Sequence, residues 1–574
     1  MDFVRVGKRF RKHIAYAATL AVATATGGAS PARGATEPDW GEGVALSSPR
    51  ANPYGLDAEA FAAARREGYL HALEYPVEVS GALIPWRPVE EFLDDRSPNP
   101  IRELLKRAFG TFTQVKSTDD LFARAGLNPY PKSSAEGADE IPHRGDEIPK
   151  TRMGVTVFRR EGVEAFTISC AACHSANLFG KKILGMTNRF ARANDFFVLG
   201  KKSIRLVSPP LFERVMHASR SETDLYARLR ERMRAVGAKE PTTLGLDTSL
   251  AQVAISLAHR GDDEYASFDP RRERSPKREP LATFVADSKP AVWWNVKYKN
   301  RFLSDGSVVS GNPIYTNILW NEIGRGTDLH ELETWFAENA KTIEELTTAV
   351  FSTEAPRYTD FFPAQTVSLD RAKRGEATFA KTCAGCHGTY AKAWNLPNAD
   401  SLPLAERLRT TEVRYPEKTK VVNVGTDPQR AQGMLSLERG LNPLAISKRN
   451  GILIKHQTGY VPPPLVGIWA RWPYFHNNSA PNLCAVLTAG KDRPKSYFAG
   501  EALDPARDYD SECGGYPEGD RVPAAWKKDA AYRYDTAKPG MGNRGHDERI
   551  FLKDGVEILT REEKRDLIEF LKTL

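Results

Sequence analysis

Apolar residues recur at helical spacing where the pattern of this chain is clearest. After Ser368, a residue suited to cap a helix, apolar positions follow one another at three- and four-residue steps as far as Cys383. Capping-box patterns at 342–345 (TIEE) and 560–563 (TREE) predict two more helix starts, and the second opens a C-terminal helix with one apolar side. The chain is therefore predicted to be mainly α-helical.

Strand-like patterns are few, and polar segments separate the helical stretches. Gly154–Phe158 and Gly451–Ile454 are the best strand candidates. Residues 36–65 are rich in Pro, Gly and Ala and predict an extended lead-in. Three further segments, rich in charged residues and proline, are predicted to be loops: 131–152, 263–281 and 397–430.

The N-terminus has the pattern of a secretory signal over residues 1–35. Five Lys and Arg residues precede an apolar, Ala-rich stretch from Ile14 to about Ala25, and small residues suited to cleavage follow it. The stretch is too short to span a membrane, although an uncleaved anchor stays open as an alternative. We expect a protein that is periplasmic or secreted and does not span the membrane after signal removal.

The net charge excludes some partners. The chain carries +8, of which residues 1–35 supply +5. The remainder is close to neutral, and its basic runs, such as 271–274, contain acidic residues. We therefore expect no nucleic-acid partner.

Two copies of one five-residue motif carry the chemistry: CAACH at 170–174 and CAGCH at 383–387. C-x-x-C-H is the attachment motif for c-type haem, in which both thiols bind the haem covalently and the histidine becomes an iron ligand. The pattern predicts two covalently bound c-type haems. The predicted haem-binding residues are Cys170, Cys173, His174, Cys383, Cys386 and His387, and the two histidines are the predicted iron ligands.

Other uses of these cysteines fit the sequence less well. A redox dithiol would stand at a strand-to-helix junction in a βαβ context, and a zinc site would need a second ligand pair. Cys484 and Cys513 remain, and in an exported protein a leftover pair predicts a disulfide.

The sixth iron ligand decides what each haem does. A strong sixth ligand makes an electron-transfer centre, whereas an open position lets O2 or peroxide bind. His71 and His143 lie far upstream in predicted loops, and His13 falls in the signal. The candidates in the C-terminal half are His456, His476, His546, Met434 and Met541.

The segment PPPLVGIWARWPYFHNNS (462–479) resembles a stretch of the bacterial dihaem cytochromes of the rubber-oxygenase-like group, which is related to the dihaem cytochrome c peroxidases. The ending, Asn543–His546 followed by 562–574, resembles that group as well. The resemblance implies that His546 is the second axial ligand of the C-terminal haem. It also implies that the N-terminal haem, held by His174, lacks a strong ligand on its other side and is the catalytic centre. Met186 and His217 are rival ligands there, and either would make the protein a plain electron carrier.

The resemblance also assigns surroundings to the haems. It implies that residues 293–306, dense in aromatic and cationic residues, form the distal region of the first haem; the alternative is an amphipathic core segment with exposed lysines. Val308 and Val309 stand where a rubber-cleaving enzyme would have a bulky aromatic residue. His476 is expected beside a haem, at a propionate, with Trp469, Asn477 and Asn478 supporting the ligands.

Together these observations predict two cytochrome c-like haem lobes with long loops and few short strands. The predicted domains are the signal (1–35), an N-terminal extension (36–150), a first haem lobe (151–365) and a C-terminal cytochrome c domain (366–574). We expect an oxidoreductase in which the first haem binds O2 or peroxide and the second relays electrons from or to a small redox protein. A pure electron-transfer cytochrome, a peroxidase and a rubber-type dioxygenase are the alternatives.

Overall fold

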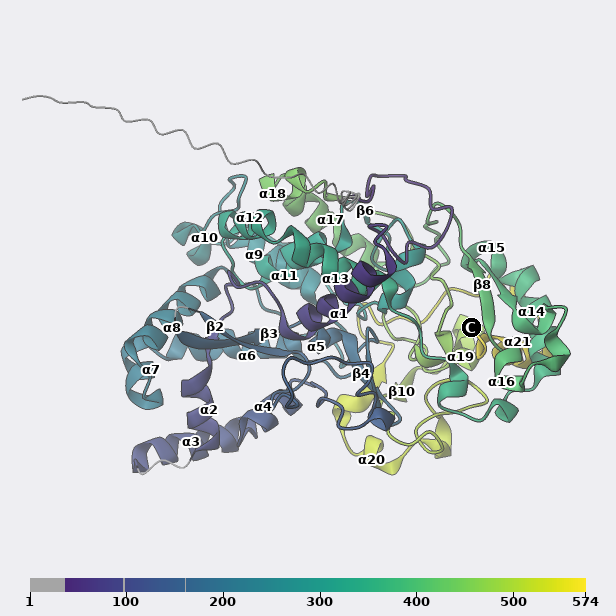
Figure 1. Ribbon diagram of the computed structural model, residues 1–574, viewed down its shortest axis with the longest axis horizontal. Helices are drawn as coiled ribbons and strands as arrows, with labels where there is room; N and C mark the ends of the chain where they lie inside the picture. Colours follow the sequence, from purple (N-terminus) through teal and green to yellow (C-terminus); the bar gives the residue numbers. More distant parts are fainter. Residues whose placement is uncertain (1–36, 96–98, 161) are drawn as a thin grey trace, which may run out of the picture. The chain divides into compact units, whose positions relative to one another are not determined.

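The computed structural model describes residues 37–95, 99–160 and 162–574, so the predicted signal lies outside the described residues. These residues fold mainly into helices joined by long connections, with short strands in small sheets, which confirms the predicted class (Figure 1). None of the helices in the described ranges has the length and apolar character needed to cross a bilayer. The helices are α1 (Ala58–Glu74), α2 (Trp86–Asp94), α3 (Pro100–Thr113), α4 (Thr118–Arg124), α5 (Ala171–His174), α6 (Ala193–Leu206), α7 (Pro209–Met216), α8 (Arg220–Arg232), α9 (Ser249–Ala258), α10 (Pro270–Arg274), α11 (Pro313–Gly324), α12 (Leu329–Glu338), α13 (Ala340–Ser352), α14 (Leu369–Thr382), α15 (Ala384–His387), α16 (Leu404–Arg407), α17 (Gln429–Leu441), α18 (Ala445–Arg449), α19 (Leu483–Val486), α20 (Ala524–Lys527) and α21 (Arg561–Leu571).

The strands form one three-stranded sheet and several two-stranded ladders. The larger sheet has the order β1-β3-β2 and is antiparallel throughout. The ladder of β6 and β9 joins segments far apart in the sequence. The strands are β1 (Ile84–Pro85), β2 (Val155–Arg160), β3 (Val163–Ile168), β4 (Ser175–Leu178), β5 (Lys181–Leu184), β6 (Val308–Ser310), β7 (Thr389–Lys392), β8 (Thr410–Arg414), β9 (Leu453–Ile454), β10 (Ser496–Phe498), β11 (Arg533–Asp535), β12 (Leu552–Lys553) and β13 (Val556–Glu557).

Two predicted helix starts are confirmed and one is wrong. The Ser368 side chain accepts a hydrogen bond from the Arg371 backbone N–H at the start of α14. Thr560 and Glu563 form the reciprocal capping box of α21. Thr342 lies inside α13 instead, because that helix begins two residues earlier, directly after the Asn339 that ends α12. The predicted strands are confirmed as β2 and β9, although β9 spans only two residues.

Helices α14 and α21 pack closely against each other, and this pair positions the second motif. A Cβ atom on Gly375 would lie 2.0 Å from the Asp566 carbonyl oxygen, so only glycine allows this approach. The Phe379 and Phe570 rings lie 5.2 Å apart in the contact. Helix α14 ends at Cys383, and α15 carries the motif histidine next to it (Figure 1).

Several segments predicted to be irregular contain regular structure. Helix α1 begins within the expected lead-in and packs along α13, so its apolar side is buried in the core. His71 belongs to this helix rather than to a loop, and its Nε2 lies 2.9 Å from Glu345 Oε2. The segment 397–430 contains α16 and β8, and β8 pairs with β7 directly after the second motif.

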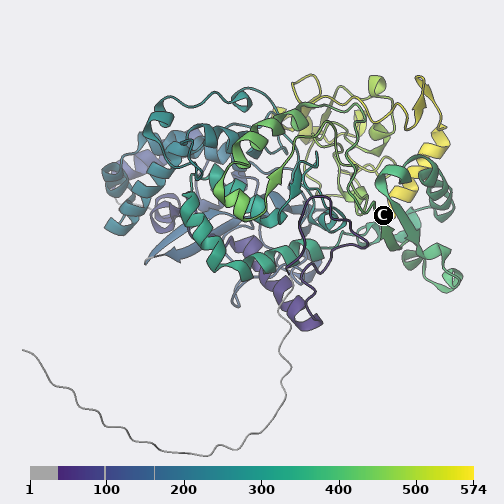
Figure 2. The same ribbon diagram turned by 90° about the horizontal axis from the view of Figure 1, so that it is seen from above.

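Residues Glu37–Leu574 form one compact unit, whose helices and loops interleave in both views (Figures 1 and 2). Its two largest hydrophobic clusters border different motifs, one at Cys170 and the other at Cys383. The first cluster also takes in α17 from the predicted C-terminal domain, and the second takes in β4 and β5 from the predicted first lobe. Each hydrophobic cluster therefore contains segments of both predicted lobes. The limits of the two lobes stay a prediction.

Candidate haem-binding site

Both C-x-x-C-H motifs line the same cavity, which has a volume of about 480 Å³. None of the four motif cysteines takes part in a disulfide, and each of them borders this space. Burial raises the pKa of the Cys170 and Cys383 thiols to about 11. The fold therefore brings all the residues predicted to bind haem to one cavity. They are Cys170, Cys173, His174, Cys383, Cys386, His387 and His546.

His174 stands in α5 with its imidazole buried. Burial lowers the pKa of His174 to about 4, and the Ala291 backbone opposes this shift. At neutral pH the ring is therefore uncharged, as a metal ligand must be. The Trp293 ring contacts it, with ring centroids 5.5 Å apart. Trp293 therefore adjoins His174, and Asn295, Lys299 and Leu303 of the same segment line the cavity, whereas a distal position of residues 293–306 stays a prediction.

The orientation of His387 is fixed by a backbone carbonyl. Its Nδ1 lies 2.8 Å from the Pro463 oxygen. Because a carbonyl can only accept a hydrogen bond, Nδ1 carries the proton and the Nε2 lone pair is left for a metal. Burial also lowers the pKa of His387, and the Arg471 charge lowers it further. This tautomer suits an axial ligand of haem iron.

His546 faces His387. The two ring centroids lie 6.2 Å apart. Two imidazoles that bind one metal from opposite sides, at about 2.0 Å per bond, have ring centroids about 6 Å apart. Burial lowers the pKa of His546 to about 3, with further contributions from His387 and Arg493, so this ring is uncharged as well.

The loop that carries His546 is held from several sides. The His546 backbone N–H donates to the Val424 carbonyl at 2.7 Å. A Cβ atom on Gly545, which has a φ of +78°, would lie 2.2 Å from the Gly425 carbonyl carbon. The Asn477 side chain donates to the Gly540 and Gly542 carbonyls, both at 3.0 Å, which gives it the supporting role expected of it.

The rival ligands do not border the cavity. Met186 is 1% exposed and packs in the second hydrophobic cluster, and His217 ends α7, where its Nδ1 lies 3.4 Å from Arg102 Nη1. His456, Met434 and Met541 are also absent from the cavity lining. Besides the three predicted iron ligands, the described cavity is lined by one further histidine, His476, and by no methionine.

His476 stacks on Tyr460, with ring centroids 4.0 Å apart. Its Nε2 is buried without a hydrogen-bond partner. Burial lowers its pKa to about 3, and the charges of Arg430 and Lys289 act in the same direction. Trp469 and Asn478 bond to distant backbone carbonyls, those of Pro356 and Gly245.

Several cavity residues were missed from sequence. Asn317 and Asn321 stand one turn apart on α11 and line the cavity, with Asn321 Nδ2 donating to Asn317 Oδ1 at 2.9 Å. Gln252 on α9 also lines it and donates to the Gly324 carbonyl at 2.9 Å. Asn317 and Asn321 could have been found from their four-residue spacing, which places two amides on one face of a mostly apolar helix.

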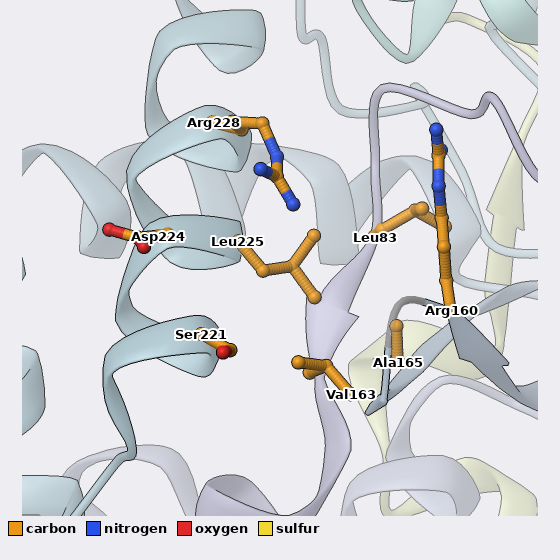
Figure 3. Close-up of a pocket in the computed structure, with 8 residues that line it drawn as sticks. All are labelled: Leu83, Arg160, Val163, Ala165, Ser221, Asp224, Leu225 and Arg228. Atoms are coloured by element: carbon orange, nitrogen blue, oxygen red, sulfur yellow. The ribbon is translucent and has the colours of Figure 1, made fainter.

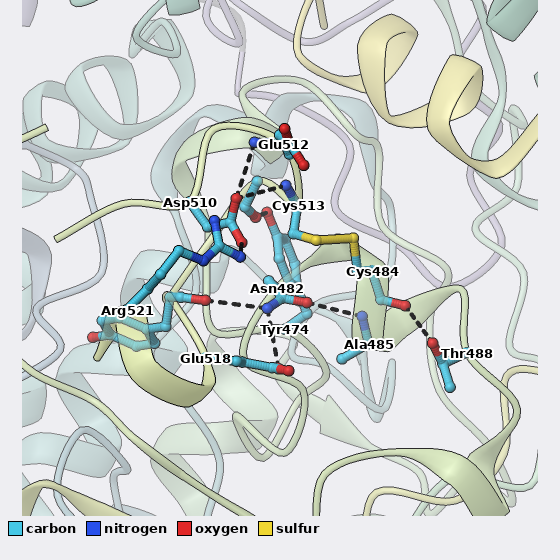
Figure 4. The surroundings of a disulfide bond; sticks show 12 residues. Tyr474, Asn482, Cys484, Ala485, Thr488, Asp510, Glu512, Cys513, Glu518 and Arg521 are labelled. Carbon is cyan, nitrogen blue, oxygen red and sulfur yellow. Dashed lines mark hydrogen bonds and ion pairs between the residues drawn. A yellow bond between two sulfur atoms is a disulfide. The ribbon is translucent and has the colours of Figure 1, made fainter. Parts of the chain in front are cut away.

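The predicted disulfide is confirmed. Cys484 and Cys513 are bonded, and Figure 4 shows Asp510 and Arg521 bound to each other beside them. Asp510 also accepts hydrogen bonds from the Glu512 and Cys513 backbone N–H groups. The bond anchors α19, whose residues Leu483 and Val486 line the cavity.

A second, smaller pocket lies between α8 and the three-stranded sheet (Figure 3). It shares no lining residue with the haem cavity. It is lined by Leu83, Arg160, Val163, Ala165, Ser221, Asp224, Leu225 and Arg228.

The residues therefore fit haem: paired, half-buried thiols, neutral imidazoles and a large cavity. Comparison with known proteins agrees. A family model described as RoxA-like, cytochrome c-like matches residues 459–498, which supports a relationship to cytochrome c and implies covalently bound haem c. The matched segment contains Pro463, His476 and Arg493, the first of which orients His387.

Two proteins of Sinorhizobium fredii are similar to parts of the chain. The uncharacterized protein y4iJ is 30% identical over 250 residues, which cover 35% of this chain and 38% of that protein. The uncharacterized protein y4iM is 33% identical over 123 residues, covering 20% and 27%. The matched parts thus span little more than a third of the length of one relative and about a quarter of the other.

Proposed function

We propose that the protein is an exported oxidoreductase with two covalently bound c-type haems. Cys170, Cys173 and His174 would hold one haem, and the second motif would hold the other. The two sites differ, and this difference carries the proposal. His546 stands opposite His387, whereas the ring contacts of the described residues pair no histidine with His174. Two unequal haem sites suit one centre that relays electrons and one that reacts.

In the second site, His387 and His546 would hold the haem iron between them. Bound haem supplies an iron that changes its charge by one electron and, where an axial position is open, takes up a small ligand. The His387–His546 pair would leave no free position there for O2 or peroxide. The Pro463 carbonyl keeps the proton of His387 on Nδ1, so its Nε2 stays available to the metal.

In the first site, His174 would hold one face and leave the other to a substrate such as O2 or peroxide. The cavity there is bordered by α6, α9 and α11, which contribute Phe197, Leu250 and Trp320. Polar groups assist proton movement during O–O cleavage. The amides of Asn317 and Asn321 are suited to bind and orient such a small polar substrate, because both line the cavity.

A pure electron carrier is the main alternative, and it would need a protein ligand opposite His174. The side chains named for that role, Met186 and His217, do not line the cavity, which favours the enzyme. The partner would be a small redox protein in the periplasm or outside the cell. A rubber-type dioxygenase stays an alternative activity. Val308 and Val309 are both buried within β6 and do not line the cavity.

Haem stoichiometry tests this proposal. Mass spectrometry and haem absorbance of the purified protein should give two haems per chain. Replacing Cys170 and Cys173 by Ala should remove one haem, and replacing Cys383 and Cys386 should remove the other. Replacing Cys484 and Cys513 is the matched control and should remove none. A protein with one haem, or a motif variant that keeps two, would refute it.

A further inference from the structure

The cavity carries an excess of positive charge. Asp247 is the one carboxylate among its described lining residues, against five cationic side chains. Charged groups in protein interiors are normally paired, because an isolated buried charge is costly. The cavity therefore needs negative charge from a bound group. The five cations are Lys289, Lys299, Arg325, Arg430 and Arg471.

Two of these cations, Arg325 and Arg430, have a nearby carboxylate, and Arg325 and Lys289 have hydrogen-bond partners within the protein. Arg325 donates to the Ile168 carbonyl at 2.7 Å, and its Nη1 lies 3.4 Å from Glu322 Oε1. Lys289 donates to the carbonyls of Pro473 and Arg471, at 2.6 and 3.2 Å. Those carbonyls satisfy its hydrogen bonds but leave its charge uncompensated.

Lys299, Arg430 and Arg471 make few hydrogen bonds to the described residues, although Arg430 has the Asp305 carboxylate nearby. Lys299 is 7% exposed, and its ammonium makes no hydrogen bond to any described residue. This burial also excludes the alternative in which the lysines of 293–306 are exposed. Arg430 Nε is buried without a hydrogen bond, 3.4 Å from Asp305 Oδ2. The Arg471 side chain donates to the Pro464 carbonyl at 3.1 Å.

Two of these cations, Arg471 and Lys289, lie close to residues that contact the motif histidines. Arg471 bonds to Pro464, next to the Pro463 that orients His387, and its charge acts on the pKa values of both His387 and Lys299. Lys289 stands two residues before Ala291, whose backbone adjoins His174. The unpartnered Nε2 of His476 completes the group, because Arg430 and Lys289 both act on this ring.

We propose that Lys299, Arg430 and Arg471, with Lys289 and His476, form one binding site for the propionate carboxylates of both haems. The inference rests on the proposed function, since it requires two haems. The carboxylates would supply the missing negative charge and accept the hydrogen bonds that these groups leave unmade. Positive charge close to a haem favours the reduced iron, so each cation would raise the reduction potential.

Potentiometric titration of the purified dihaem protein tests this site. Lys299→Met and Arg430→Gln should each lower the midpoint potential of at least one haem while both haems stay attached. Lys299→Arg keeps the charge and should stay close to the wild type. Lys392→Met is the matched control: Lys392 is 1% exposed, does not line the cavity and donates to the Thr573 carbonyl at 2.6 Å, so both potentials should stay unchanged.

Two results would overturn the inference. Unchanged potentials in both Lys299→Met and Arg430→Gln, with two haems bound, would refute the site and leave the proposed function standing. A wild-type potential that changes when chloride replaces phosphate at constant ionic strength would show that the cations hold a solvent anion instead. A wild-type protein without two haems would refute the proposed function itself.

Discussion

Arg493 Nη1 donates a hydrogen bond of 2.7 Å to the carbonyl of Gly545, the residue before His546. The same guanidinium also bonds to the carbonyls of Asn543 and Ala485, and it lies over the Phe475 ring. One side chain therefore links α19 to the loop that presents His546. This makes Arg493 a positioning residue for the second haem.

We predict that Arg493→Met loosens this loop. His546 should then bind iron less firmly, and part of the second haem should become high-spin, while the haem content stays at two. Visible and electron paramagnetic resonance spectra measure the change. Lys491→Ala, an exposed change in the same segment, is the control and should leave the spectrum as in the wild type. A fully low-spin second haem in Arg493→Met would contradict this role.

His546→Ala should have a larger effect of the same kind. Removing the imidazole opposite His387 leaves an axial position empty, so one low-spin haem should become high-spin. Added imidazole should restore the low-spin spectrum, because it can occupy the vacated space. His456→Ala, a histidine outside the cavity lining, should change nothing. An unchanged spectrum in His546→Ala would remove this assignment.

The disulfide should stabilise the folded protein. Cys484 and Cys513 are 29 residues apart, and closing a loop of this length stabilises by about 3.6 kcal/mol through the unfolded chain. Replacing both cysteines by Ala should lower the free energy of unfolding by about that amount, as measured by denaturant titration. Adding a reductant should lower the stability of the wild type and leave the double variant unaffected; equal stability of the two proteins would contradict the prediction.

Asp566 should make stability depend on pH. Its carboxylate on α21 accepts hydrogen bonds of 2.8 Å from Arg371 and 2.7 Å from Arg374 on α14. Burial raises the pKa of Asp566, but the bonds from Arg374 and Arg371 outweigh it, so the pKa is lowered overall. The stabilisation is therefore complete above the unfolded-state pKa of about 3.9 and is lost as pH falls through the lower folded-state pKa.

Asp566→Asn should accordingly cost about 2 kcal/mol at pH 7, as expected for hydrogen bonds to a charged group. The difference from the wild type should shrink below about pH 4, where the wild-type carboxyl also becomes protonated. Thermal unfolding at a series of pH values measures both. A difference that persists undiminished at the lowest pH would show that the charge is not responsible.

Local sequence signals predicted the local features well. Ser368 and Thr560 cap helices because their neighbours supply the capping partners at fixed spacing. The Thr342 pattern failed because α13 begins directly after Asn339, which also ends α12, so Thr342 falls inside the helix. The loop-like composition of 397–430 also led to a wrong prediction, since β8 forms there by pairing with β7.

The site residues were predictable from sequence where a single short motif contains all the groups that bind the haem. His174 and His387 are predicted by the C-x-x-C-H motif itself. His546 was predicted only from the resemblance to a known family, because its own segment contains no motif that marks it as an iron ligand. Lys299, Arg430 and Arg471 come from separate parts of the chain, and only the fold brings them to one cavity. Met186 lies close to the first motif in sequence, yet its side chain is buried in the neighbouring hydrophobic cluster.

The two haems should differ in one respect: one has an open axial position and the other does not. Electron paramagnetic resonance and visible spectra of the purified oxidised protein, with and without peroxide, and of the reduced protein, with and without O2, test it most directly. We predict one low-spin haem that ignores the added ligands and one haem whose spectrum changes when they are added. Two low-spin haems, both indifferent to peroxide and O2, would contradict the account.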